Sequence, residues 1–196
     1  MSNPTLKYNS IFCLEGEWNE NDLREKTSVQ QLLSYMENSL GVESVFRKVN
    51  SGESFFKYLR ILDKYWKGKF NSYGIIYFAF HGETNCIWLD NNEKLTLDEL
   101  AVEASDILKD RIIHFGSCNI FMEDKVNLYN FFKNSGARAV SGFSSEIPFL
   151  ESSVFDIAYL SKLSEYDKPG FIDNYIKNNL SQLADKLGFV YIDKNS

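Results

Sequence analysis

The chain has 196 residues, of which 44% are hydrophobic and 15% aromatic, and its formal net charge is −6. This composition excludes a disordered chain and supplies enough apolar residues for the core of one domain, which we expect to span residues 1–196. The negative charge disfavours nucleic acid as a partner, because binding to phosphates requires clustered Lys and Arg side chains.

The cysteine content and the apolar segments indicate the compartment. Three cysteines without paired spacing are typical of a reducing environment rather than of a disulfide scaffold. The first residues lack the pattern of a secretory signal, and no apolar stretch approaches the roughly 20 residues of a membrane span. We therefore expect a cytoplasmic protein that has no membrane partner.

Strand and helix patterns alternate in the first part of the chain. Short apolar runs without polar alternation predict strands that are buried on both faces, and apolar residues at helical spacing predict helices. In chain order, the expected elements are a strand at 10–14, a helix at 29–40, a strand at 45–49, a helix at 55–66 and a strand at 75–80.

A hairpin is expected after the third strand. Residues 86–89 and 94–96 read as short extended pieces around the turn-rich tetrapeptide Asp90-Asn91-Asn92-Glu93. Thr96-Leu97-Asp98-Glu99 has the form of a capping box, so a helix is expected to begin near Leu97.

The alternation continues to the end of the chain. The expected elements are a strand at 111–115, a helix at 126–134, a strand at 137–142, a helix at 154–163, a long helix at 172–187 and a strand at 188–193. Val154, Ile157, Ala158 and Leu163 are expected to line the helix at 154–163. Alternating β and α elements predict an α/β fold, a three-layer α/β/α sandwich with a mostly parallel sheet.

Two motifs at strand ends carry the candidate chemistry. His81-Gly82 and Gly116-Ser117-Cys118 each follow a buried apolar strand, and the carboxyl ends of parallel strands meet at one edge of a sheet. A thiol beside an imidazole is the pair that a cysteine nucleophile needs, because the base generates the thiolate. The backbone N–H groups of Gly82 and Cys118 are candidate oxyanion-hole donors. The alternative is that both motifs are ordinary strand ends, since free cysteines are usually buried and inert.

The segments Tyr77-Phe78-Ala79-Phe80-His81-Gly82 and Ile112-Ile113-His114-Phe115-Gly116-Ser117-Cys118, separated by the hairpin, resemble the caspase-like cysteine peptidases (clan CD). The bacterial CHAT-type proteases are the most similar in pattern, and the resemblance covers roughly residues 73–143. It implies an endopeptidase with His81 as general base and Cys118 as nucleophile, without a cofactor.

The same resemblance implies a protein or peptide substrate and control by a regulatory partner or an oligomer, with a role in bacterial stress or antiviral defence. Gly116 departs from the Gln that lines the specificity pocket of caspases, so their specificity does not transfer. In caspase-like folds the segments after the first and fifth strands also form this pocket. Here those segments carry Glu15, Glu17 and Glu146, which leads us to expect Lys or Arg before the scissile bond. The alternative is that they are solvated loop carboxylates.

A zinc site is an alternative interpretation of these residues. His81-x4-Cys86 and His114-x3-Cys118 superficially resemble zinc ligand pairs. On an extended strand, however, His114 and Cys118 would lie about 13 Å apart at about 3.3 Å per residue, too far for one ion. We expect no metal, a hydrogen-bonded His114 inside the sheet, and packing roles for Cys13 and Cys86.

The main alternative function is a non-catalytic domain of the same fold, which would bind peptides at the sheet edge without cleaving them. A flavodoxin- or receiver-like signalling domain is disfavoured, because His81 stands where a matching Asp would end the third strand. Asp90 and Glu83 are candidates for orienting His81, and neither is assigned.

Overall fold

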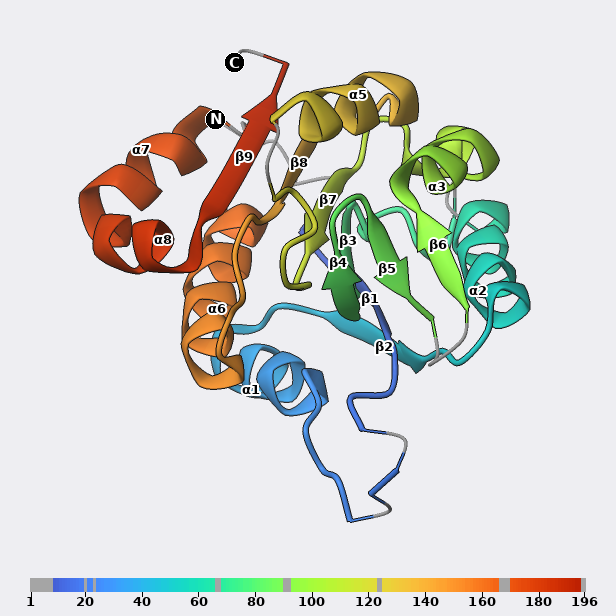
Figure 1. The fold of residues 1–196 in the computed structure, drawn as a ribbon, viewed down its shortest axis with the longest axis horizontal. Coiled ribbons are helices and arrows are strands. Elements are labelled where there is room, and N and C mark those ends of the chain that lie inside the picture. The colour runs from blue at the N-terminus through green and yellow to red at the C-terminus, as the bar shows by residue number, and fades with distance from the viewer. Residues whose placement is uncertain are drawn as a thin grey trace.

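The computed structural model of the chain describes residues 9–19, 21–22, 24–65, 68–89, 93–122, 125–165 and 170–194. Within them, a six-stranded sheet with the order β2-β1-β3-β7-β8-β9 lies between two layers of helices (Figure 1). The prediction of a three-layer α/β/α sandwich with a mostly parallel sheet is confirmed.

The sheet is parallel except at one edge. Its strands are β1 (Ile11–Glu15), β2 (Ser44–Lys48), β3 (Ile75–Ala79), β7 (Ile112–Phe115), β8 (Ala139–Phe143) and β9 (Phe189–Asp193), of which β9 runs antiparallel to β8. Every residue of β1, β3, β7 and β8 is buried. Helices cover both faces of these strands, which explains why their sequences are continuous apolar runs.

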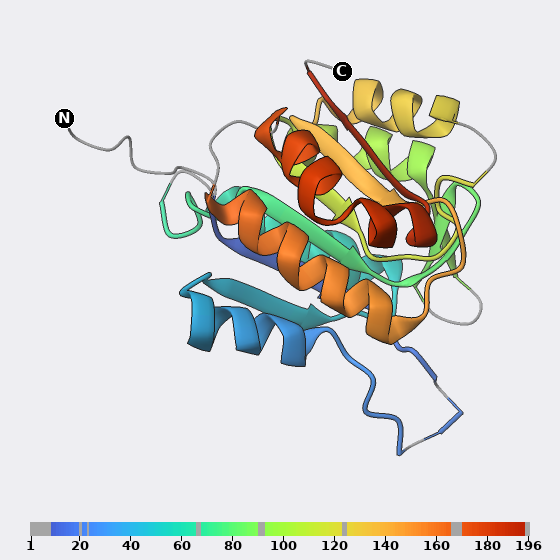
Figure 2. The same cartoon turned by 90° about the vertical axis from the view of Figure 1, so that its left-hand side faces the viewer.

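Each face of the sheet packs against its own set of helices. One face meets α2 (Gly52–Lys64), α3 (Leu97–Glu103), α4 (Ser105–Leu108) and α5 (Lys125–Ser135). The other face meets α1 (Gln30–Leu40), α6 (Phe149–Glu165), α7 (Gly170–Asn179) and α8 (Ser181–Leu187). Figure 2 shows α1 and α6 side by side along the second face. None of the helices in the described part of the chain has the length and apolarity needed to cross a membrane.

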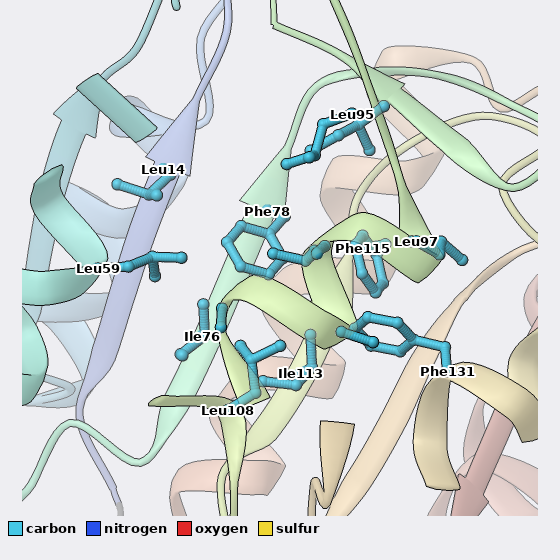
Figure 3. Close-up of a cluster of buried hydrophobic side chains, with 14 of the residues drawn as sticks. Leu14, Leu59, Ile76, Phe78, Leu95, Leu97, Leu108, Ile113, Phe115 and Phe131 are labelled. Carbon is cyan, nitrogen blue, oxygen red and sulfur yellow. The ribbon is translucent and has the colours of Figure 1, made fainter. Parts of the chain in front are cut away.

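The pleat of β3 divides its side chains between two cores. Ile76 and Phe78 enter the core under α2 to α5, whereas Ile75 and Tyr77 enter the core under α6. Figure 3 shows the first core, in which the ring centroid of Phe115 lies 5.4 Å from those of Phe78 and Phe131. Truncation of one such buried ring to Ala costs about 3–5 kcal/mol in comparable cores.

The hairpin after β3 is a small antiparallel sheet. β4 (His81–Glu83), β5 (Cys86–Trp88) and β6 (Lys94–Thr96) pair in sequence order. The predicted pieces at 86–89 and 94–96 are confirmed, and the expected turn at 90–92 lies outside the described residues. Sequence analysis missed β4, because His-Gly-Glu carries no apolar alternation.

Two helical predictions are wrong in part. Val154 was expected to line the core but is 53% exposed, because α6 buries a mixed polar and apolar face. That face consists of Ser152, Phe155, Asp156, Tyr159, Leu160, Leu163 and Ser164. The single helix expected at 172–187 is broken at Leu180, whose φ of −127° is not helical, so α7 and α8 are separate helices.

The remaining boundaries agree closely with expectation, and the short helix α4 was not foreseen. The helix expected at 55–66 corresponds to α2, and residue 66 lies outside the described part of the chain. Cys13 and Cys86 are buried, as their predicted packing roles require.

The capping box at α3 gives a test of the local fold. The Thr96 hydroxyl accepts a hydrogen bond from the Glu99 N–H, and the Glu99 carboxylate accepts one from the Thr96 N–H. Thr96→Ala should lower the free energy of unfolding by about 1 kcal/mol, because one N–H at the helix start loses its acceptor. Urea denaturation measures this change. Thr96→Ser keeps the hydroxyl and should stay near wild type, and equal losses in both variants would contradict the capping role.

Candidate active site

The register of two parallel strands brings the candidate nucleophile and base together. Phe78 of β3 lies opposite Phe115 of β7, and the Gly116 N–H donates to the Phe78 carbonyl at 2.9 Å. His81 and Cys118 each stand three positions beyond these partners. Both side chains line one cavity at this edge of the sheet.

Gly82 packs directly against the segment that carries Cys118. A Cβ atom at Gly82 would lie 2.2 Å from the Cys118 carbonyl oxygen and 3.1 Å from the Cys118 nitrogen. No side chain fits in this space, so the close approach of the two strand ends requires glycine. The two proposed oxyanion donors therefore belong to backbone segments that touch.

His81 is held by a main-chain carbonyl group. Its Nε2 lies 2.7 Å from the Trp18 carbonyl oxygen, and the Trp18 ring meets the imidazole edge-on with the ring centroids 5.2 Å apart. A carbonyl oxygen only accepts hydrogen bonds, so Nε2 is the donor of this contact and carries a proton. In a neutral ring with this contact, Nδ1 is the basic nitrogen, as a general base needs.

Trp18 was missed by sequence reasoning, because any residue type supplies a carbonyl group. Of the two side chains considered for orienting His81, Glu83 instead pairs with Lys94, with its Oε2 2.9 Å from the Lys94 Nζ. Asp90 lies outside the described residues. Because the partner of His81 is a backbone carbonyl, the sequence contains no third motif for a residue that orients the base.

The Cys118 thiol faces the start of α6. The Ile147 N–H donates to the sulfur at 3.5 Å, and Ile147 stands two positions before the first residue of this 17-residue helix. The sulfur also lies 3.9 Å from the Ile147 carbonyl oxygen, to which the thiol donates. Cys118 is half-buried, unlike the other two cysteines, and it lines the cavity.

The other two cysteines have the opposite environment. Burial, with a smaller contribution from the nearby carboxylate of Glu15, raises the pKa of Cys13 well above its ordinary value. Burial and the charge of Glu83 also raise the pKa of Cys86. Neither thiol is suited to act as a nucleophile near neutral pH.

The cavity beside Cys118 has a volume of about 350 Å³. One wall comes from a single face of α6, where Phe149, Ser152, Ser153 and Asp156 follow helical spacing. The opposite side comes from the segment between β1 and α1, which projects from the sheet in Figures 1 and 2 and carries Trp18. The volume is at the lower end of the range for small-molecule sites, about 300–1,000 Å³.

A buried polar network adjoins the cavity. Asp156 accepts hydrogen bonds from the Tyr77 hydroxyl at 2.6 Å and from His114 Nε2 at 3.0 Å. His114 Nδ1 lies 2.9 Å from the Ser141 hydroxyl, which also contacts the Tyr159 hydroxyl at 2.9 Å. His114 is thus a satisfied histidine within the sheet, as predicted, and it is closed to solvent.

Tyr77 acts as a fixed donor in this network. Burial, followed by the negative charge of Asp156, raises the pKa of Tyr77 well above its ordinary value, so the phenol stays protonated. Gly116 makes room for this ring, because a Cβ at that position would lie 2.7 Å from the Tyr77 hydroxyl oxygen. Gly116 lines the cavity, and its lack of a side chain allows Tyr77 to reach Asp156.

None of the three glutamates expected in a specificity pocket is among the described residues that line the cavity. Glu15 is buried and accepts hydrogen bonds from the Trp18 indole at 2.8 Å, the Ser28 hydroxyl at 2.6 Å and the Val29 N–H at 2.6 Å. Its carboxylate therefore anchors the segment that carries Trp18.

The other two expected carboxylates face solvent. Glu17 forms an exposed ion pair with Lys48 at 2.7 Å, and Glu146 is exposed. Instead, the structure places Asp156 in the cavity, a residue that sequence analysis did not select. The sequence feature that could have identified Asp156 is an acidic residue within an otherwise apolar stretch of a helix.

The described residues include no group of three or more His, Cys, Asp or Glu side chains arranged to hold a metal ion. His114 is engaged with Asp156 and Ser141, so it is not directed at Cys118 as a ligand pair would require.

The model of a family of unknown function, DUF6642, matches residues 8–192. The chain belongs to the DUF6642 family. No curated protein matches it. The matched range covers the sheet of this DUF6642 domain except for Asp193, the last residue of β9, and includes both strand-end motifs.

Glu15, the last residue of β1, and Glu17, two positions later, provide a matched pair of variants. Glu15→Ala should lower the free energy of unfolding of the DUF6642 domain by about 2–3 kcal/mol, because three donors lose their acceptor. Glu17→Ala removes only an exposed ion pair and should cost less than about 1 kcal/mol. Chemical denaturation measures both values. Similar costs for the two variants would refute the anchoring role of Glu15.

Gly82 can be tested in the same way. Gly82→Ala should separate the strand ends and reduce the rate of Cys118 alkylation at least about 10-fold, because the added methyl collides with the Cys118 backbone. Gly68→Ala is the control, since the nearest atom to a Cβ there is 3.9 Å away. Alkylation is followed by peptide mass spectrometry, and an unchanged rate in Gly82→Ala would show that the close approach is not needed.

Proposed function

We propose that this DUF6642 domain is a cysteine endopeptidase that hydrolyses peptide bonds with a His81–Cys118 dyad. The observation that carries the proposal is the hydrogen bond between His81 Nε2 and the Trp18 carbonyl oxygen, at the cavity that Cys118 also lines. In the neutral ring this contact leaves Nδ1 as the base, and the imidazole shares the cavity with a half-buried thiol. An inert strand-end cysteine would need no such oriented base.

The dyad gives a balanced reaction. His81 Nδ1 takes the thiol proton, and the Cys118 sulfur forms a bond to the carbonyl carbon of the scissile peptide. The N–H groups of Gly82 and Cys118 donate to the resulting oxyanion. The imidazolium, stabilised through Nε2–H by the Trp18 carbonyl, then protonates the leaving amine as the C–N bond breaks.

Hydrolysis of the thioester completes the cycle. His81 Nδ1 takes a proton from water, the hydroxide attacks the acyl carbon, and the C–S bond breaks to release the carboxylic acid. The proton returns to the Cys118 sulfur. Every proton in this scheme moves through His81, so no metal or organic cofactor is required.

The resemblance to CHAT-type proteases supports a bacterial protease of stress or antiviral defence that acts in the cytoplasm on a protein or peptide substrate. Three free cysteines are consistent with a reducing compartment. Because an unregulated protease would be harmful there, we expect control by a protein partner or by an oligomer. The acidic net charge of −6 argues against a nucleic-acid partner.

The second candidate is a peptide-binding module that does not cleave. The observation that favours it is the exposed apolar surface at the start of α6, where Phe149, Leu150 and Val154 surround the cavity wall. Exposed apolar residues next to a cavity are typical of protein-binding sites. Thiol reactivity distinguishes the two functions, because binding alone needs no activated sulfur.

Site-resolved alkylation tests the proposal. Limiting iodoacetamide at mildly acidic pH should modify Cys118 in preference to Cys13 and Cys86, whose raised pKa values leave less thiolate as the pH falls. His81→Ala should abolish this preference, with at least a roughly 100-fold slower rate at Cys118. Peptide mass spectrometry gives the rate at each thiol.

Cleavage of an unfolded protein substrate by wild type, and its loss in Cys118→Ala, provides the second readout. Slow alkylation of Cys118 in both wild type and His81→Ala would favour the peptide-binding module over the peptidase.

A further inference from the structure

One acidic side chain that lines the cavity is almost fully buried. The Asp156 side chain is 3% exposed and lies among the residues that line the cavity. Its carboxylate accepts hydrogen bonds from the Tyr77 hydroxyl at 2.6 Å and from His114 Nε2 at 3.0 Å. This network holds the carboxylate in place beside the cavity.

Asp156 is the acidic member of this buried network. Its Oδ1 lies 3.0 Å from His114 Nε2, and His114 Nδ1 lies 2.9 Å from the Ser141 hydroxyl oxygen. That hydroxyl also accepts from the Tyr159 hydroxyl at 2.9 Å and donates to the Ile113 carbonyl at 3.4 Å. The described residues that line the cavity include no Lys or Arg beside Asp156.

The rest of the cavity suits a long cationic side chain. Glu25 is the second acidic residue of the lining, and no Lys or Arg occurs among the described lining residues. Backbone and side-chain hydrogen bonds within its own turn lower the pKa of Glu25, so this carboxylate is ionised at neutral pH. The potential in the cavity is therefore negative.

Two aromatic rings flank this negative region. Trp18 and Phe149 meet edge to face with their centroids 5.9 Å apart, and both line the cavity. Such rings pack against the methylene stem of Lys or Arg and attract the cationic end. An acidic side chain would be repelled by the carboxylates of Asp156 and Glu25, and an apolar one would bring no opposite charge to this lining.

We propose that this cavity binds a Lys or Arg side chain of the substrate, at the residue before the scissile bond, with the Asp156 carboxylate as counter-charge. The inference rests on the proposed peptidase function, because Cys118 and the cavity are treated as one site. A preference for Lys or Arg was expected from Glu15, Glu17 and Glu146, and we assign it to Asp156 instead.

Covalent peptide probes test the charge preference directly. Four peptidyl acyloxymethyl ketones that differ only in the last residue, Arg, citrulline, Leu or Asp, are incubated with the full chain. The Cys118 sulfur displaces the carboxylate leaving group to form a thioether, which intact-mass spectrometry counts. Citrulline has the shape of Arg without its charge, so the Arg-to-citrulline ratio of labelling rates isolates the electrostatic contribution. The expected ratio in wild type is roughly 100-fold.

The Asp156→Asn variant tests whether the Asp156 carboxylate causes the preference for Arg. Asn retains the size of Asp, and its oxygen can accept from His114 while its NH₂ group donates to the Tyr77 oxygen, so the fold is expected to persist. The variant should reduce the Arg-to-citrulline ratio to within about 3-fold of unity while iodoacetamide still labels Cys118 at the wild-type rate. Glu17→Gln is the matched control, because this exposed carboxylate does not line the cavity and should change the ratio by less than about 3-fold.

The outcomes separate this inference from the proposed function. If iodoacetamide labels Cys118 but the Leu or Asp probe reacts as fast as the Arg probe, or no peptide probe reacts, the cavity assignment is overturned and the activated thiol remains. If neither iodoacetamide nor any probe labels Cys118, the peptidase proposal fails and the cavity assignment fails with it. The wild-type comparison decides the charge preference even if Asp156→Asn does not fold.

Discussion

β3 and β7 pair in parallel with Phe78 opposite Phe115, and their shared direction carries two chain segments to the same edge of the sheet. Beyond that edge the segments remain in contact, because Gly82 leaves no space between itself and the Cys118 backbone. The position of His81 relative to Cys118 therefore depends on backbone pairing rather than on flexible side chains. Such rigidity is what a dyad needs, since proton transfer requires groups held within hydrogen-bond reach.

The core between the sheet and α6 contains polar side chains where it meets this helix. Asp156 joins this helix to β3 through Tyr77 and to β7 through His114, so one carboxylate connects three elements. A buried charge of this kind contributes little net stability, because desolvation offsets much of the attraction to its partners. Its position beside the cavity is what connects the fold to the proposed specificity.

The three carboxylates near the site have different roles because their surroundings differ. Glu15 is surrounded by N–H and O–H donors and orders the segment that carries Trp18. Glu17, two residues later, faces solvent and pairs with Lys48. Asp156 is enclosed and borders the cavity. Through Trp18, Glu15 influences both the wall of the cavity and the carbonyl that orients His81, although it touches neither the cavity nor the imidazole.

The sequence by itself determined the order of the six main-sheet strands and of most helices, the mostly parallel sheet and the placement of His81 and Cys118 at one sheet edge, because apolar periodicity and strand-end position are local properties. It also determined the capping box at Thr96 and the packing roles of Cys13 and Cys86. The exposed Val154 and the break at Leu180 were not predictable, since burial of a helical face depends on what the neighbouring elements present to it.

Only the tertiary structure decided which groups serve the site. The Trp18 carbonyl has no side-chain signature, and Asp156 becomes part of the cavity because α6 crosses the sheet above Tyr77 and His114. Glu15 changed from a candidate pocket residue to an anchor because its donors come from residues that only the folded loop brings together. These assignments depend on contacts between segments far apart in the chain, and local sequence patterns carry no information about such distances.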